Sequence, residues 1–255
     1  MVILNSNNSI NLNFKRKRSL KYNLSLIANT KSTSHLVSIE KYSKGSFLVK
    51  EREPIKGLFF ILKGKVKIFN FGPNKVTQTL FLASEGEVVG LSSFKSSYYW
   101  SNAIVVEDVE TYFLSINSLK SILKSNNKMC LLFLDAISMR LRQYEMRQKH
   151  LSLLPAPERI IDSLLLTAFK FGSKTARGLK LSLCNSRREL ASFSNTSIEL
   201  TIRTLRKLHS ENIISITGKC ITILDVNELV IRLKKYSIEE DILEEHSHCY
   251  PNLFY

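Results

Sequence analysis

The stretch "RRELASFSNTSIELTIRTLRKLHSENIISI", Arg187 to Ile216, contains two short segments of helical periodicity with a polar break between them. Ser186 precedes the first segment as an N-cap, and Glu189 three residues later completes a capping box. The break "SNTS" is typical of a tight turn. The pattern therefore predicts a first helix over 187–193, a turn, and a second helix.

The second helix of this stretch has two different faces. Its N-cap is either Thr196 or Ser197, since both side chains can accept a hydrogen bond from the first turn. One face is apolar and predicted to point inward: Ile198, Thr201 or Ile202, Leu205 and Leu208. The opposite face is charged, with Glu199, Arg203, Arg206 and Lys207. Such an outer face suits the major groove of DNA, so the stretch favours a helix-turn-helix.

The residues after the second helix, "IISITGKCITILD", form a two-strand pattern around Gly218 and Lys219. This pattern predicts a small hairpin, the wing that follows a helix-turn-helix in many DNA-binding domains. Between Glu158 and Lys235 there are 14 Lys and Arg residues against 7 Asp and Glu residues, a surplus that would attract DNA phosphates. A small α/β packing unit without a nucleic-acid role is the alternative.

Two prolines upstream mark a boundary. Pro155 and Pro157 in "LLPAPERI" disfavour helix in the residues before them. An amphipathic helix follows over Glu158–Phe171 and ends at Gly172. The winged unit is therefore predicted to start at this hinge.

Before the hinge, residues 118–151 have helical periodicity. A seam of side chains steps by three and four: Met129, Leu132, Ala136, Met139, Gln143, Met146 and His150. Phe133, Ile137 and Leu141 lie on an adjoining face. Because one helix with two apolar faces needs two partners, we predict that the seam pairs with a second copy in a parallel homodimer. A helix buried inside one domain is the alternative.

The region from Leu36 to about Leu114 consists of short β-branched and aromatic runs separated by turn residues. The segment "GLFFILKGKVKIFNFGPNKVTQTLFLASEGEVVG" shows several such runs with glycines at the breaks. Glycine supplies the positive φ of tight turns, so the pattern predicts antiparallel hairpins in a roll, sandwich or small barrel.

The two ends of the chain differ in charge. The first 35 residues contain no acid and include "KRKR" at Lys15–Arg18, which predicts a disordered basic arm, with an organelle transit peptide as the alternative. The last twenty residues contain five acids and no base, which predicts a solvated acidic tail.

The composition of the whole chain excludes several classes. With 255 residues, a net charge of +15 and a pI near 9.7, the protein will attract polyanions, and no apolar run reaches the length of a membrane span. The cysteines have no metal-site or disulfide-framework spacing, which favours free thiols in a reducing compartment: Cys130, Cys184, Cys220 and Cys249.

A β-roll, a long helix and a winged helix-turn-helix, in this order, resemble the cyclic-AMP receptor/Fnr family of transcription regulators. Within the family, the chain is similar to the NtcA-type nitrogen regulators of cyanobacteria and red-algal plastids. The resemblance covers about 37–229 and rests on four motifs: "FFILKGKVKI", "EGEVVG", "ISMRLRQYEM" and "LSLCNSRRELASFSNTSIELTIRTLRKLHSENIISITGKCITILD".

The resemblance implies an α+β fold with an N-terminal antiparallel β-roll like that of cyclic-nucleotide-binding proteins. The predicted parts are a disordered basic arm over 1–35, a β-roll effector-type domain over 36–117, a dimerisation helix over 118–154, a winged helix-turn-helix over 155–235 and an acidic tail over 236–255.

In NtcA-like members the resemblance implies 2-oxoglutarate as the effector, held between roll and helix. The matching positions here are Gly90, Leu91, Tyr99, Arg140 and Glu145. The loop that carries an anchoring arginine in the family reads "SSFKSSYYWSNAIVV" and has no Arg, although a carboxylate ligand favours a bidentate Arg. A surface charge pair is the alternative for Arg140 and Glu145, and the sequence leaves open whether an effector binds.

On the same resemblance, DNA contacts fall on both helices and the wing: Arg187, Arg188, Thr196, Ser197, Glu199, Arg203, Arg206, Lys207 and Lys219. Arg203 and Glu199 match base-contacting positions, whereas Ile198 replaces an Arg that reads guanine. Because Ile can only touch a thymine methyl group, we expect an altered or relaxed target sequence. The cluster-binding cysteines of oxygen-sensing Fe–S members are absent.

These observations predict a homodimeric transcription regulator, an activator that responds to nitrogen and binds double-stranded promoter DNA. RNA polymerase is the expected partner, and the expected location is a plastid stroma or a bacterial cytoplasm. No membrane, metal or cofactor is expected. Because the sequence contains no phosphate loop, zinc spacing or nucleophile–base pair, no catalysis is expected. A sensor whose helix-turn-helix docks a protein, and a nonspecific nucleoid protein, are the alternatives.

Overall fold

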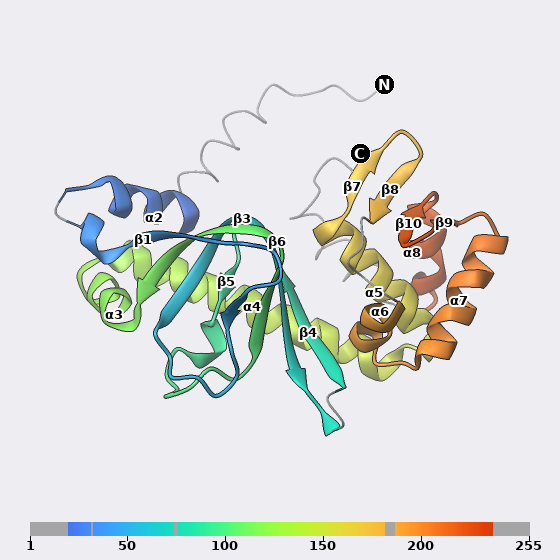
Figure 1. Ribbon diagram of the computed structural model, residues 1–255, viewed down its shortest axis with the longest axis horizontal. Helices are drawn as coiled ribbons and strands as arrows, with labels where there is room; N and C mark the ends of the chain where they lie inside the picture. Colours follow the sequence, from blue (N-terminus) through green and yellow to red (C-terminus); the bar gives the residue numbers. More distant parts are fainter. Residues whose placement is uncertain (1–19, 32, 74–75, 182–186, 237–255) are drawn as a thin grey trace. The chain divides into compact units, whose positions relative to one another are not determined.

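The computed structural model describes residues 20–31, 33–73, 76–181 and 187–236 (Figure 1). The chain divides into two compact units, Met1–Val66 with Ala83–Arg140, and Lys67–Leu82 with Leu141–Tyr255. The predictions on Ser186, Cys184, Cys249, "KRKR" and the acidic tail beyond Tyr236 lie outside the described residues. Cys130 and Cys220 are free thiols.

The first unit is built on an antiparallel sheet, as predicted. Its strands are β1 (Ser38–Tyr42), β2 (Phe47–Val49), β3 (Gly57–Phe71), β4 (Thr77–Ala83), β5 (Val88–Val89) and β6 (Asn102–Ser115). The order is β1-β6-β3-β4, with β2 paired to β6 and β5 paired to β3. Most of β4 and the end of β3 belong to the second unit. The predicted α+β class with a β-roll is therefore confirmed.

Of the predicted disordered arm over 1–35, the structure describes residues 20–31 and 33–35, and most of these are helical. Residues Leu20–Asn29 form helix α2, followed by the short helix η1 (Ser34–Leu36). Leu24 is 3% exposed and packs in the core of the first unit, together with Val37 and Leu58. The acid-free composition suggested disorder, but apolar side chains at helical spacing give α2 a buried face.

The helix predicted over 118–154 is in fact two helices, α3 (Ile116–Ser125) and α4 (Asn127–Leu153). Asn126 lies between them in an extended conformation, with φ −139° and ψ 93°. Its side-chain oxygen accepts a hydrogen bond from Met129 N over 3.1 Å and so caps the second helix. The break arises because an Asn that caps a new helix competes with continuation of the first.

The faces of α4 also differ from the prediction. Met129, Met146 and His150, assigned to the dimer seam, are between 1% and 9% exposed within the single chain. The large apolar side chains that α4 leaves exposed are Leu131, Leu134, Ile137, Met139, Leu141 and Leu153. Because α4 carries apolar residues on most sides, its periodicity could not show which side the rest of the chain covers.

The second unit contains α5 (Ala156–Phe171), β7 (Ser173–Thr175), β8 (Gly178–Leu181), α6 (Arg187–Ser194), α7 (Ile198–Ser210), β9 (Ile214–Thr217), β10 (Cys220–Ile223) and α8 (Val226–Lys234). Its four strands form one antiparallel sheet in the order β7-β8-β10-β9. Helices α5, α6 and α7 and the β9–β10 wing were predicted, whereas α8 was not. Strands β7 and β8 were not predicted either, because strands of three and four residues give little periodicity. No helix within the described ranges is long and apolar enough to cross a membrane.

Candidate nucleic-acid interface

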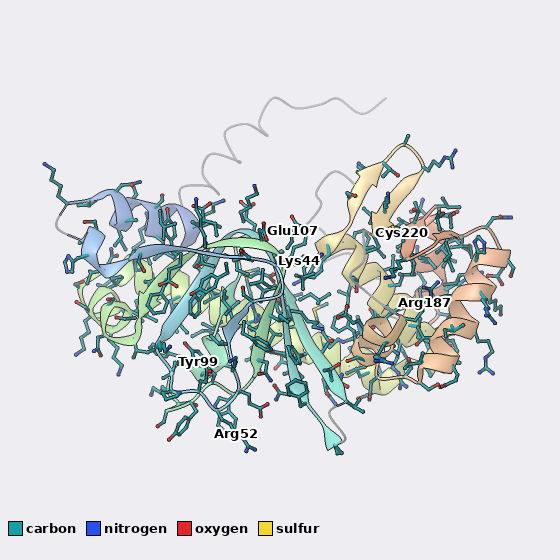
Figure 2. All side chains as sticks on the ribbon, viewed as in Figure 1. Lys44, Arg52, Tyr99, Glu107, Arg187 and Cys220 are labelled. Atoms are coloured by element: carbon teal, nitrogen blue, oxygen red, sulfur yellow. The ribbon has the colours of Figure 1, made fainter. Side chains whose placement is uncertain are left out.

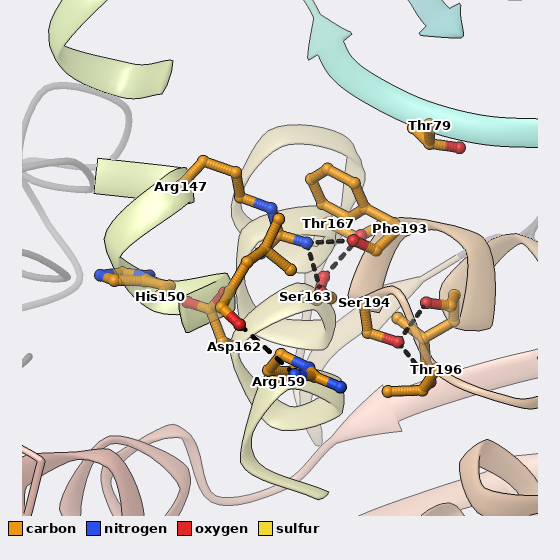
Figure 3. Close-up of polar contacts among 12 residues, drawn as sticks. Thr79, Arg147, His150, Arg159, Asp162, Ser163, Thr167, Phe193, Ser194 and Thr196 are labelled. Carbon is orange, nitrogen blue, oxygen red and sulfur yellow. Dashed lines mark hydrogen bonds and ion pairs between the residues drawn. The ribbon is translucent and has the colours of Figure 1, made fainter. Parts of the chain in front are cut away.

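The turn between α6 and α7 is held by hydroxyl groups (Figure 3). Thr196 Oγ1 lies 2.7 Å from Ser194 Oγ and 3.1 Å from Thr201 Oγ1. Thr196 N donates to Ala191 O over 3.0 Å, which closes the turn on α6. Asn195 adopts a left-handed conformation, with φ +51°, which Asn tolerates better than most residues. The turn therefore fixes the angle at which α7 leaves α6.

Helix α7 begins as one of the two alternatives predicted. Ser197 is the N-cap, and its hydroxyl accepts a hydrogen bond from Leu200 N over 3.1 Å. The buried residues of the helix are Thr201, Thr204, Leu205 and Leu208, while Ile198 and Ile202 are half-buried. Of the predicted inward residues, Leu205 and Leu208 are each 1% exposed and belong to the hydrophobic core of the second unit.

The predicted charged residues lie on the outer, solvent-exposed face of α7. Glu199, Arg203, Arg206 and Lys207 are all exposed. Within the described residues, none of the three cations has a side-chain hydrogen bond or ion pair. A cation that is not engaged inside the protein can form charge-assisted bonds with phosphates or base edges. This face is therefore suited to a polyanion.

The wing follows α7 directly. Ile213, just before the hairpin, donates its N–H to Leu208 O in α7 over 3.0 Å, and its carbonyl oxygen accepts from Leu224 N over 2.9 Å. Both ends of the hairpin are therefore hydrogen-bonded close to the end of α7. Gly218 supplies the positive φ of the turn, +59°. Lys219 is exposed at the tip. The wing therefore presents a cation on a short, supported hairpin.

A buried polar cluster ties the end of α4 to α5 and α6 (Figure 3). Arg147 Nη1 donates to Asp162 Oδ2 over 2.6 Å, and His150 Nδ1 lies 3.0 Å from Asp162 Oδ1. Arg147 also donates to Ser163 Oγ over 3.0 Å and to the carbonyl oxygen of Phe193, whose ring lies 4.3 Å from the guanidinium. Buried charges persist when they are paired, so this cluster fixes the three helices together.

The hairpin of β3 and β4 covers one side of α6 within the second unit. Ser192 Oγ accepts from Thr79 N over 3.0 Å, and Gln78 Nε2 donates to Ser192 O over 2.9 Å. Lys67 and Glu189 form an ion pair of 2.7 Å with little solvent exposure. Glu189, predicted as half of a capping box, therefore bonds to the hairpin. Arg188 stays exposed and Arg187 is half-buried.

Neither the polar cluster around Asp162 nor the contact between the β3–β4 hairpin and α6 was predicted from the sequence. Asp162 in the apolar run "ERIIDSLLLTAF" was a usable signal, since a carboxylate within such a run must be either exposed or paired. Nothing in the local pattern of Ser192 or Lys67 points to their partners, which are more than 100 residues away in the chain.

The effector residues predicted in the roll are partly brought together. Gly90 has φ +88°, and a Cβ atom placed on it would lie 3.3 Å from Tyr99 Cε1. Arg140 Nη2 donates to Val88 O over 3.3 Å, and Leu91 begins the short helix η3 (Leu91–Ser93). Glu145 is exposed and belongs to the second unit.

Tyr99 is engaged inside the roll (Figure 2). It is 4% exposed, and its hydroxyl donates to Gly57 O over 2.8 Å and accepts from Gly57 N over 3.2 Å. Burial raises the pKa of this hydroxyl above its ordinary value. The ring therefore fills the space next to Gly90 and forms part of the packed interior. These five effector positions stay predictions.

Known proteins match both halves of the chain. A cyclic nucleotide-binding domain model matches residues 39–126, and a Crp-like helix-turn-helix domain model matches residues 158–230. The Global nitrogen regulator of Synechocystis sp. is 27% identical over 188 residues, which cover 72% of this chain and 84% of that protein. The CRP-like cAMP-activated global transcriptional regulator of Mycobacterium tuberculosis is 24% identical over 194 residues, covering 76% and 87%.

Solved structures show the same fold. FixK2 of Bradyrhizobium japonicum aligns with a TM-score of 0.65 at 20% identity, covering 76% of this chain and 95% of its own. A CRP-family regulator of Thermus thermophilus aligns with a TM-score of 0.68 at 16% identity, covering 78% and 96%.

A β-roll followed by a winged helix-turn-helix with an open, basic second helix defines a DNA-binding regulator. With both domain models matched in that order, the chain belongs to the Crp/Fnr family of transcription regulators. The family predicted from the sequence is therefore confirmed. The proteins that it resembles are transcription regulators and not enzymes. The DNA-contact positions in α6, α7 and the wing stay predictions.

Proposed function

We propose that this regulator binds promoter DNA as a homodimer and reads its sequence with α7. The observation that carries the proposal is the exposed set of Arg203, Arg206 and Lys207, which have no side-chain partner within the described residues. Regulators with this motif place the second helix in the major groove, where Arg bonds bidentately to guanine and Glu accepts from cytosine. Arg203 and Glu199 then read bases.

The remaining predicted positions contact the DNA backbone. They lie on α6, in the turn, on α7 and in the wing: Arg187, Arg188, Thr196, Ser197, Arg206, Lys207 and Lys219. Phosphate contacts of this kind fix the register of a protein on DNA and carry no direct sequence information. Base discrimination in this proposal therefore rests on a small part of the interface.

The dimer surface that we propose is the exposed side of α4. On the part of α4 that belongs to the first unit, Leu131, Leu134 and Ile137 are 64%, 55% and 37% exposed, a large apolar area for one helix. A second copy of the same helix would cover this stripe in a two-fold arrangement. Leu134→Glu should yield a monomer in analytical ultracentrifugation, whereas Lys128→Glu on the same helix should remain dimeric. A dimeric Leu134→Glu protein would refute this surface.

A selection from a random pool of DNA duplexes tests the function without knowledge of the target genes. The dimer should enrich a two-fold symmetric site with half-site centres about 10 base pairs apart, or a multiple of that spacing. Failure to enrich any sequence, with equal affinity for all duplexes, would favour a nonspecific nucleoid protein. Failure to bind DNA at all would favour a helix-turn-helix that docks a protein.

The relatives named Global nitrogen regulator support a role in nitrogen regulation. We further propose an activator that responds to nitrogen and works with RNA polymerase, in a plastid or a bacterial cytoplasm. The packing of Tyr99 against Gly90, with no Arg within residues 92–106, supports a roll that no longer senses 2-oxoglutarate. Binding isotherms on the selected duplex, with and without 2-oxoglutarate, test whether the roll senses this effector. An unchanged Kd supports loss of sensing, and a tightened Kd overturns it.

A further inference from the structure

A groove of about 450 Å³ runs beside the outer face of α7 in the second unit. Helices α5, α7 and α8 line it. Helix α5 contributes Pro157, Glu158 and Ile161, and α7 contributes Leu200, Arg203, Thr204, Lys207 and Leu208. Glu211 follows α7, and Arg232 and Lys235 come from α8 and its C-cap. The groove therefore combines apolar side chains with charges, and it includes a residue proposed to read DNA.

The charges of the groove are not balanced. Arg232 is paired with Glu211 over 2.8 Å and with Glu228 over 3.0 Å, and Lys235 is paired with Glu158 over 3.4 Å. These pairs account for the acids that line the groove. Arg203 and Lys207, on the α7 side, have no side-chain partner within the described residues. A ligand that fits this groove carries acids together with apolar side chains.

The chain itself supplies such a ligand immediately after the groove. Tyr236 packs against the core of the second unit, next to the groove residue Lys235. The sequence continues as "SIEEDILEEHSHCYPNLFY", with five acids between residues 239 and 245 and no base. Ile238 and Ile242 are four residues apart, a spacing that brings side chains to one side of a helical turn.

We propose that residues 238–245 dock into this groove and compete with DNA for α7. Ile238 and Ile242 contact the apolar side chains of the groove, and the acids pair with Arg203 and Lys207. Ile238 is two residues beyond Tyr236, a reach of at most ~7 Å, so the segment starts at the groove. Attachment to the same chain gives such a contact an effective concentration of the order of millimolar, which compensates for weak individual ion pairs.

Docking and DNA binding exclude each other because both use Arg203 and Lys207. The segment therefore weakens binding to every duplex, and the effect decreases as salt screens the acids. This inference rests on the proposed DNA binding. It adds a control on affinity that works without any effector in the roll.

The test measures Kd on the selected duplex by fluorescence anisotropy, using the full chain. A variant with Glu239→Gln, Glu240→Gln, Asp241→Asn, Glu244→Gln and Glu245→Gln should bind about tenfold more tightly at low salt. The gain should shrink to less than twofold at about 0.5 M salt. Removal of residues 246–255, which contain no acid, is the matched control and should leave Kd unchanged.

A second variant separates docking from a long-range effect of charge. Ile238→Ser with Ile242→Ser keeps all five acids, so a general electrostatic effect predicts an unchanged Kd, whereas docking predicts tighter binding. An unchanged Kd in both variants, with DNA binding intact, would overturn the docking proposal alone. If neither the wild type nor the two variants bound DNA, the proposed function itself would be contradicted.

Discussion

The roll and helix α7 both carry residues that the family resemblance assigns to a ligand, but the side chains in the two regions have different surroundings. In the roll, Tyr99 is 4% exposed and its hydroxyl bonds to both backbone groups of Gly57. On α7, Arg203 is exposed and has no side-chain partner within the described residues. A side chain bonded inside the fold contributes to stability, whereas one left open can contribute to binding.

The comparison implies that changes at side chains bonded inside the fold, such as Tyr99, should act on stability. Changes at side chains without a partner, such as Arg203, should act on DNA binding. Any variant in which the two effects are exchanged would contradict it.

Tyr99→Ala should have the largest effect, a loss of about 3–5 kcal/mol in the free energy of unfolding, because it empties a packed aromatic site. Tyr99→Phe keeps the ring and should cost only about 1–2 kcal/mol, the price of leaving the Gly57 backbone groups without the hydroxyl. Urea unfolding followed by circular dichroism measures both. A cost below about 1 kcal/mol for Tyr99→Ala would show that the ring is not packed beside Gly90.

Ile198→Arg should restore a base contact at the start of α7. A bidentate Arg–guanine pair is worth about 1–3 kcal/mol of discrimination, so a new selection should gain a guanine in each half-site. The matched control is Ser210→Arg, which adds the same charge at the far end of α7 and should tighten all duplexes equally. If both variants select the same sequence as the wild type, position 198 does not face the bases.

Ser197→Ala should lower the free energy of unfolding by about 1 kcal/mol, because the hydroxyl caps α7 through Leu200 N. Ser197→Asp keeps a capping oxygen and should retain stability, but its carboxylate would repel phosphates and weaken DNA binding. Thermal unfolding and anisotropy on the same samples separate the two roles. A Ser197→Asp protein with unchanged Kd would place this cap away from the DNA.

Lys219→Ala should have the smallest effect. Removal of one phosphate contact weakens binding to all duplexes equally and lowers the slope of log K against log salt by about 1. Lys120→Ala, an exposed lysine of α3 in the first unit, is the control and should leave the slope unchanged. An unchanged slope for Lys219→Ala would mean that the wing does not touch the backbone.

The parts predicted well from the sequence depend on neighbours in the chain. The turn, a cap at either Thr196 or Ser197 and the wing at Gly218 follow from residue types within a few positions. The structure has all three, with the cap at Ser197. These features are local because a cap or a tight turn needs particular side chains at fixed offsets.

The parts that were missed depend on distant partners. The covered side of α4 is set by what packs on it, and its apolar pattern fits several sides equally well. The pairing of Asp162 with Arg147 and His150, and of Ser192 with the β3–β4 hairpin, requires the folded chain. Helix α2 was not predicted, because its acid-free composition is also typical of a disordered arm, and only the folded chain shows that Leu24 is buried.

The most direct test of DNA reading by α7 is the ratio of Kd for a scrambled duplex to Kd for the selected duplex, in the wild type and in Arg203→Ala. Loss of a bidentate base contact should lower this ratio about tenfold or more, with little change in stability, because Arg203 is exposed. An unchanged ratio in a folded, dimeric Arg203→Ala protein would contradict the claim that α7 reads the DNA sequence.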